Sequence, residues 1–220
     1  MTQRIEAITT AATSLFLTQG YSKTQISHIA KAVGVSVGTI YHDFIGKEEI
    51  MHYILKCTID PTFAKQELET PIHKEQFVGL EQDIVALFKK SANDFERPLV
   101  SNLVDYTFEM LISDAFDLLS RYAVGCLFIE KNQYDFPFLA SQYKAYRKQF
   151  FCAMTSYIQA FIANGTVRHI DDVELTTLLI IEILTWWAMD MRYTTFETSD
   201  VSPETAKKVC MDNILSAYKK

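Results

Sequence analysis

A short stretch of the chain, from Ser36 to Phe44, carries side chains that suit contact with another molecule. If the stretch is helical, Ile40 and Phe44 lie on one face because they are four residues apart. The other face then holds the side chains of Val37, Thr39, Tyr41 and His42. These groups can make hydrogen bonds and methyl contacts, so we interpret the exposed face as a binding surface.

Motifs for bond-making chemistry are missing from the sequence. It has no glycine-rich phosphate loop, no GxSxG and no HExxH, and its five histidines are scattered. The cysteines are far apart and form no CxxC pair, so we expect reduced, mostly buried thiols at Cys57, Cys126, Cys152 and Cys210. We therefore predict neither an enzyme nor a cofactor or metal protein.

The residues before this surface meet the requirements of a helix-turn-helix. We expect the first helix to begin at the N-cap Thr24, and Ala30 is small enough to let two helices cross closely. Gly34 permits a positive φ in the turn, and Ser36 caps the second helix. Gly38 costs a helix about 1 kcal/mol relative to alanine, which makes sense if its backbone must approach another surface. In such a motif the second helix enters the major groove of DNA.

The rest of the chain also reads as helices with short breaks. Glycine and proline number only 7 and 5 among 220 residues, and 49% of the residues are hydrophobic, which favours an all-α fold with a sizeable core. No apolar run reaches the length of a membrane span, so we expect a soluble, cytoplasmic protein. The predicted helices cover about residues 2–18, 24–33, 36–43, 47 onward, 77–95, 98–112, 114–131, 137–164, 171–194 and 202–218.

Charge is distributed unevenly along the sequence. Residues 1–56 carry five basic and four acidic side chains, whereas the remainder carries 16 basic and 23 acidic ones. The N-terminal part is only faintly basic, so we expect modest non-specific affinity for DNA. We predict a helix-turn-helix domain over 1–56 and a second helical domain over 57–220, with the boundary near Cys57 to Pro61.

The N-terminal residues resemble the Tet repressor family of transcription regulators. The resemblance rests on Arg4…Ala11-Ala12…Leu15-Phe16…Gly20-Tyr21…Thr24…Ile29-Ala30…Val33-Gly34-Val35-Ser36-Val37-Gly38-Thr39-Ile40-Tyr41…Phe44…Lys47-Glu48. It implies a homodimeric repressor that is released from a palindromic operator by a small, largely hydrophobic effector. The positions that it assigns to DNA contact are Thr24, Gln25, Ser36, Val37, Thr39, Tyr41, His42 and Lys47.

One position departs from the family pattern. The family usually has histidine before the residue that aligns with Phe44, and this chain has Asp43. A carboxylate would be repelled by phosphate, so Asp43 is expected to cap or pair locally instead. An activator role stays open, because the motif specifies docking and not the sign of regulation.

The second domain is rich in aromatic residues, most of which we expect in the core. The resemblance places the dimer interface in the helices at 137–164 and 171–194, and it makes the fourth helix, before Pro61, the link between the domains. The predicted effector contacts are Asp105, Tyr106, Glu109, Phe128, Glu182 and Trp186, whose acids would meet a cationic, aromatic ligand. Salt bridges or a solvated edge are the alternative for the acids, and a helical interaction module that does not bind DNA is the alternative for the protein as a whole.

Overall fold

A computed structural model describes residues 2–195 and 201–220 of the chain. The described residues form α-helices, short 3₁₀ turns and one π-helical turn, with two isolated β-bridges and no β-strand. The predicted all-α fold is confirmed. The chain forms two compact units: unit 1 comprises Met1–Ala86 and Val124–Ala140, and unit 2 comprises Leu87–Ala123 and Ser141–Lys220. The functional division at residues 56 and 57 stays a prediction.

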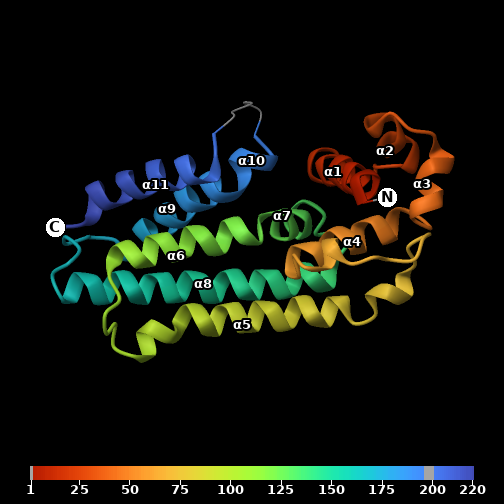
Figure 1. Cartoon of the computed structure of the whole chain (residues 1–220). Coiled ribbons are helices and arrows are strands. Elements are labelled where there is room, and N and C mark those ends of the chain that lie inside the picture. Colours follow the sequence, from red (N-terminus) through yellow and green to blue (C-terminus); the bar gives the residue numbers. More distant parts are fainter. Residues whose placement is uncertain (1, 196–200) are drawn as a thin grey trace. The chain divides into compact units, whose positions relative to one another are not determined.

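Unit 1 is built on four N-terminal helices (Figure 1): α1 (Thr2–Thr18), α2 (Ile26–Val33), α3 (Val37–Asp43) and α4 (Lys47–Ile59). Helix α1 packs against α2 and α4, and α2 packs against α3. The side chains at the centre of this packing are fully buried; they include Ile8, Phe16, Ile29, Ile40, Phe44 and Ile50. Because Ile40 and Phe44 face inward, as the spacing predicts, the opposite face of α3 exposes Val37, Tyr41 and His42.

A long connection between α4 and α5, the α4–α5 strap (residues 60–79), returns to the end of α3. It contains the 3₁₀ turns η1 (Phe63–Lys65) and η2 (Lys74–Phe77). The Ile72 N–H donates to the carbonyl of Asp43 at 2.8 Å, and the Ile45 N–H donates to the carbonyl of Ile72 at 3.1 Å. Since the Ile72 side chain is also fully buried, the strap fixes the end of α3 in place.

Helix α7 (Ala123–Lys131) and the turn after it complete unit 1. Gly125 lies against α4, where a Cβ would meet the Thr58 side chain at 3.1 Å. Phe128 packs edge-on to Phe16 of α1, with ring centroids 5.9 Å apart. Both neighbours come from much earlier in the sequence, which is why sequence periodicity did not place α7 here.

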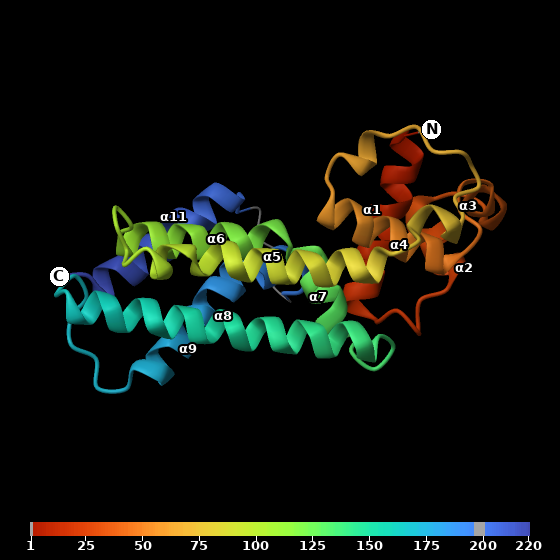
Figure 2. The same ribbon diagram turned by 90° about the horizontal axis from the view of Figure 1, so that it is seen from below.

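Unit 2 is a bundle of helices (Figure 2): parts of α5 (Leu80–Val100) and α8 (Pro137–Ala163), with α6 (Phe108–Arg121), α9 (Val173–Thr185) and α11 (Pro203–Tyr218). A helix of three residues, α10 (Met191–Tyr193), also belongs to it. Helix α6 packs against α9 and α11. Helices α5 and α8 are joined by a buried hydrogen bond of 2.5 Å from the Tyr157 hydroxyl to the carbonyl of Phe95. A π-helical turn, η3 (Trp186–Asp190), connects α9 to α10.

Several predicted boundaries agree with the structure, and others were wrong. Helices α8 and α11, and the α9–α10 segment, match the predictions to within a few residues. The predicted break before residue 98 was wrong, because α5 continues through Pro98 to Val100. The chain instead breaks at residues 101–107, where Asn102, Leu103 and Asp105 adopt positive φ. Over the residues described, none of the helices is both long and apolar enough to span a membrane.

Candidate nucleic-acid interface

The turn between α2 and α3 has the predicted geometry. Gly34 ends α2 with φ 79°, and its N–H donates to the carbonyl of Ala30 at 2.9 Å. The Ser36 hydroxyl oxygen accepts from the Thr39 N–H at 3.1 Å, which makes Ser36 the N-cap of α3. It also lies 2.9 Å from the Thr39 hydroxyl, so these two polar side chains are held together at the start of the helix.

The outer face of α3 exposes side chains of mixed character. Val37 is 40% exposed and Tyr41 is 49% exposed, so this face presents apolar surface beside the polar side chains of the helix. A Cβ at Gly38 would meet only the Ser36 hydroxyl, at 3.6 Å. The backbone of Gly38 is therefore open on its outer side, so a large ligand can approach it closely. Thr39 is half-buried, and His42 is exposed.

Asp43 is fully buried and forms an ion pair with Arg4 of α1. The Arg4 Nε donates to Oδ2 at 2.5 Å and Nη2 donates to Oδ1 at 2.6 Å, while the His42 Nδ1 lies 3.0 Å from Oδ1. Burial raises the pKa of Asp43, but the hydrogen bonds from Arg4 and His42 outweigh it and hold that pKa below its usual value. The expectation that Asp43 pairs locally agrees with this geometry.

Lys47, at the start of α4, is held by the turn between α1 and α2. Its Nζ donates to the carbonyl of Tyr21 at 2.8 Å and lies 4.1 Å from the centre of the Tyr21 ring. Burial lowers the pKa of Lys47, although Asp135 opposes the shift. An ammonium has three donors, so this contact leaves Lys47 able to bind an anion.

The predicted contacts at the start of α2 lie in different environments. Helix α2 begins at Ile26 with Gln25 as its N-cap, so the predicted start at Thr24 was wrong. Thr24 is 1% exposed, and its hydroxyl donates to the carbonyl of Gly20 at 2.8 Å. Its side chain therefore braces the turn, whereas Gln25 is exposed beside the first turn of α2.

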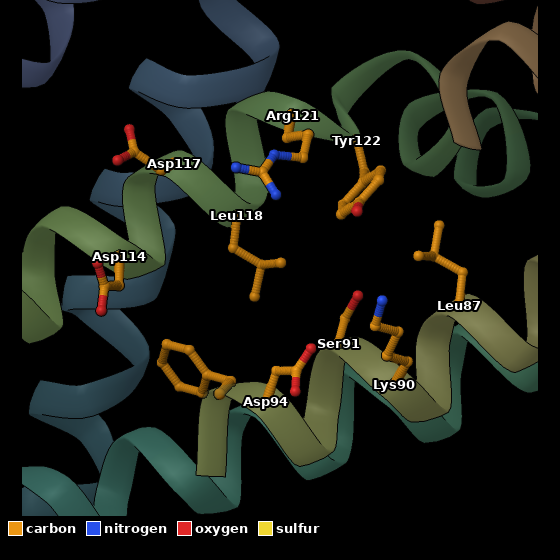
Figure 3. Close-up of a pocket in the computed structure, with 10 residues that line it drawn as sticks. Leu87, Lys90, Ser91, Asp94, Asp114, Asp117, Leu118, Arg121 and Tyr122 are labelled. Atoms are coloured by element: carbon orange, nitrogen blue, oxygen red, sulfur yellow. The ribbon is translucent and has the colours of Figure 1, made fainter. Parts of the chain in front are cut away.

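A pocket of about 330 Å³ lies between α5 and α6 in unit 2 (Figure 3). Leu118 and Tyr122 point toward α5, and Lys90 and Ser91 point back toward α6. Its lining also includes three aspartates and an arginine: Asp94, Asp114, Asp117 and Arg121. On each helix the lining residues are three or four positions apart, so they share one face. This face carries both acidic and basic side chains, and it therefore gives no clear apolar pattern in the sequence.

The six predicted effector contacts do not come together at this pocket. Phe128 belongs to unit 1, and the other five belong to unit 2. Glu109 pairs with Lys219, and Glu182 lies 3.6 Å from Arg147, which matches the salt-bridge alternative. Of the remaining three, Asp105 is exposed and Trp186 is 47% exposed. Tyr106 donates a hydrogen bond from its hydroxyl to the pocket residue Asp114 at 2.9 Å.

Other sequence expectations concern thiols and metals. Cys126 and Cys210 are buried, Cys57 is half-buried and Cys152 is exposed, so the expected burial holds for two of the four. Burial raises the pKa of both Cys57 and Cys210 to about 11, which keeps these thiols protonated. Within residues 2–195 and 201–220, histidine, cysteine, aspartate and glutamate form no cluster of three suited to a metal ion.

The sequence comparisons match the N-terminal part of unit 1. A profile of "Bacterial regulatory proteins, tetR family" matches residues 8–54. A curated relative, the HTH-type transcriptional regulator HbdR of Aromatoleum sp. (strain CIB), is 43% identical over 58 residues. That alignment covers 26% of this chain and 25% of the relative, so the match spans about a quarter of either protein.

Solved structures show the same fold over nearly the whole chain. The ketosteroid transcriptional regulator KstR2 of Mycobacterium tuberculosis superposes with a TM-score of 0.54 at 20% identity, covering 99% of this chain and 95% of that one. The probable transcriptional regulatory protein RHA5900 gives 0.51 at 20% identity, with 97% of each chain covered. The matched residues 8–54 thus resemble the tetR family of bacterial regulatory proteins, and the chain as a whole shares its fold with these two regulators.

Proposed function

We propose that this protein is a repressor that binds a palindromic operator as a homodimer and releases it when a small molecule binds. The observation that carries the proposal is the outer face of α3. Val37 and Tyr41 are exposed there, the backbone of Gly38 is accessible, and Ser36 caps the start of the helix. A face of this kind fits the major groove, where methyl groups and hydroxyls meet base edges.

The contacts divide into two kinds. Val37 and Thr39 lie in the first turn of α3, which enters the groove first, and are proposed to meet base edges together with Ser36. Phosphates are the proposed partners of Gln25, Tyr41, His42 and Lys47. Such contacts fix the position of the protein along the duplex. Thr24 is proposed to act through its backbone position rather than its hydroxyl, because that hydroxyl is bonded within the turn.

A second copy of this chain is the proposed partner of α9. Four large apolar side chains lie exposed along this helix and the π-helical turn after it: Leu175, Leu178, Leu179 and Trp186. Their spacing places them on one side of the helix, and such a stripe is costly to leave in water. Dimers are typical of the family, and a dimer through α8 and α9 gives the two copies of α3 that a palindrome requires.

The pocket between α5 and α6 is the proposed effector site. Its volume of about 330 Å³ suits a small molecule. Phe95 and Leu118 offer apolar contact, whereas Lys90, Arg121 and the aspartates offer both charges. We therefore propose an amphipathic effector. In the variant Leu118→Trp the larger side chain fills the pocket. This variant should still bind DNA, but compounds that release the unchanged protein from DNA should no longer release it.

The proposal is tested by selecting duplexes from a random pool with the purified protein. Enrichment of a palindrome, with half-site centres about 10 base pairs or a multiple apart, is the expected result. The same selection with Tyr41→Ala should enrich nothing. An enriched sequence without two-fold symmetry would contradict dimeric binding, and equal enrichment by the variant would contradict a role for α3.

A further inference from the structure

The turn between α7 and α8, which we call the α7–α8 corner (residues 132–136), is bonded directly to the end of α1. Asn132 is 3% exposed, and its amide Nδ2 donates to the carbonyl of Phe16 at 3.3 Å and to that of Phe128 at 2.9 Å. Phe16 lies in the last turn of α1, where carbonyls have no partner within the helix. A residue 116 positions away therefore caps α1.

The same amide group also holds the turn that follows α1. The Asn132 Oδ1 accepts from the Tyr21 N–H at 2.6 Å, and the Ser22 hydroxyl donates to Asp135. Figure 2 shows the α7–α8 corner beside the turn between α1 and α2. Two side chains of the corner thus bind two consecutive residues of the turn.

Aromatic packing reinforces these hydrogen bonds. The Tyr21 ring lies 5.1 Å from the ring of Phe136 and 6.1 Å from that of Phe128, measured between centroids. Phe16 completes the cluster at 5.2 Å from Tyr21. Burial in this cluster, with nearby carboxylates, raises the pKa of Tyr21 to about 12. The position of Tyr21 is therefore set from both its backbone and its ring.

Tyr21 in turn holds Lys47. The ammonium of Lys47 bonds to the Tyr21 carbonyl and lies over its ring, as described above. Lys47 is the first residue of α4 and follows α3 after a three-residue connection. A continuous set of contacts thus runs from Asn132 through Tyr21 to a proposed phosphate ligand.

We propose that Asn132 and Asp135 are positioning residues for the DNA interface, because together they set where Lys47 lies. The corner ends at Phe136, and α8 begins at Pro137 and continues without a break to Ala163. The corner fixes the turn between α1 and α2, and that turn holds Lys47. This inference rests on the proposed DNA binding for its meaning, but the placement of Lys47 can be measured without DNA.

The first test measures how fast the ammonium of Lys47 is methylated by formaldehyde and a borohydride, read by mass spectrometry with exposed Lys31 as the internal reference. In Asn132→Ala the rate at Lys47 should rise several-fold relative to Lys31. Asp135→Ala, which removes the contact with Ser22, should raise the rate at Lys47 relative to Lys31 by a smaller factor. Ile84→Val, a buried change at the start of α5, is the control that should leave the ratio unchanged. An unchanged ratio in both corner variants would overturn the proposal.

The second test is a double-mutant cycle on the selected operator duplex. Asn132→Ala and Lys47→Ala should each weaken binding several-fold and lower the slope of log affinity against log salt by about 1 per subunit. Their combination should be no weaker than Lys47→Ala alone, because Asn132 has nothing left to position once Lys47 is removed. Additive losses would show that the corner does not act through Lys47. If the unchanged protein shows no Tyr41-dependent binding, the proposed function fails, whereas the methylation ratio still decides the positioning role.

Discussion

Arg4 and Asp43 form a two-point ion pair although 39 positions separate them, with donor–acceptor distances of 2.5 and 2.6 Å. The pair ties the first turn of α1 to the last residue of α3. The carbonyl of Asp43 is bonded at the same time to Ile72 of the strap. The end of the proposed recognition helix is thus fixed from two sides, and Asp43 is unavailable to DNA.

Asp43→His introduces the residue that the family usually has at this position, and we expect it to destabilise this protein. The imidazole would face Arg4 in a site with no exposed side-chain surface. The Arg4 side chain is partly exposed to water, whereas that of Asp43 is buried. Loss of the ion pair should therefore lower the free energy of unfolding by about 1–3 kcal/mol. Urea denaturation measures this loss. A variant as stable as the unchanged protein would show that the ion pair does not hold α3.

The stability contributed by Asp43 should depend on pH. Its pKa is lower in the folded protein than the unfolded value of about 3.9, so the folded state favours the charged carboxylate. This contribution is complete above the unfolded pKa and is lost as pH falls through the folded pKa. The stability difference between the unchanged protein and Asp43→Asn should therefore shrink below about pH 4. A difference that grows as pH falls would contradict the assignment.

Gly38→Ala should change stability and DNA binding in opposite directions. A Cβ at this position makes only an ordinary contact with Ser36, so the helix should gain about 0.5–1 kcal/mol. Affinity for the operator should fall, because the added methyl group stands where the duplex approaches. Thermal unfolding and a binding titration on the same preparation test both signs. Unchanged affinity would place this part of α3 away from DNA.

Leu178→Glu combined with Leu179→Glu should produce a monomer. These leucines are 45% and 53% exposed on α9, and two carboxylates there would repel those of a second copy. Sedimentation equilibrium measures the mass of the assembly directly. Val209→Glu alters an exposed apolar residue on α11 and is the matched control, which should remain a dimer. Dissociation of the control but not of the α9 variant would place the interface elsewhere.

Local features of the fold could be predicted from the sequence, and long-range ones could not. The cap at Ser36, the turn at Gly34 and the inward positions of Ile40 and Phe44 follow from residue type and spacing over a few positions. The return of the strap to Ile45 depends on backbone hydrogen bonds, which carry no side-chain signal. Two partners of Asn132, Phe16 and Tyr21, are equally invisible in the sequence, because they lie more than a hundred residues earlier.

The predicted effector contacts illustrate the same limit. A carboxylate within an apolar stretch predicts a buried contact, yet Glu109 is paired with Lys219 at the surface. The pocket between α5 and α6, which is the proposed effector site, is lined by charged residues spaced along amphipathic faces of these two helices. Spacing along one helix reveals a face, but it does not reveal which other helix that face meets.

The most direct test of the central claim is a titration of the protein's own upstream DNA with the unchanged protein and with Tyr41→Ala, over a series of salt concentrations. The predicted result is saturable binding to a palindromic segment by two chains, lost in the folded variant, with affinity falling as salt rises. Equal binding by both proteins to the upstream DNA and to a scrambled duplex would contradict the claim that α3 reads DNA.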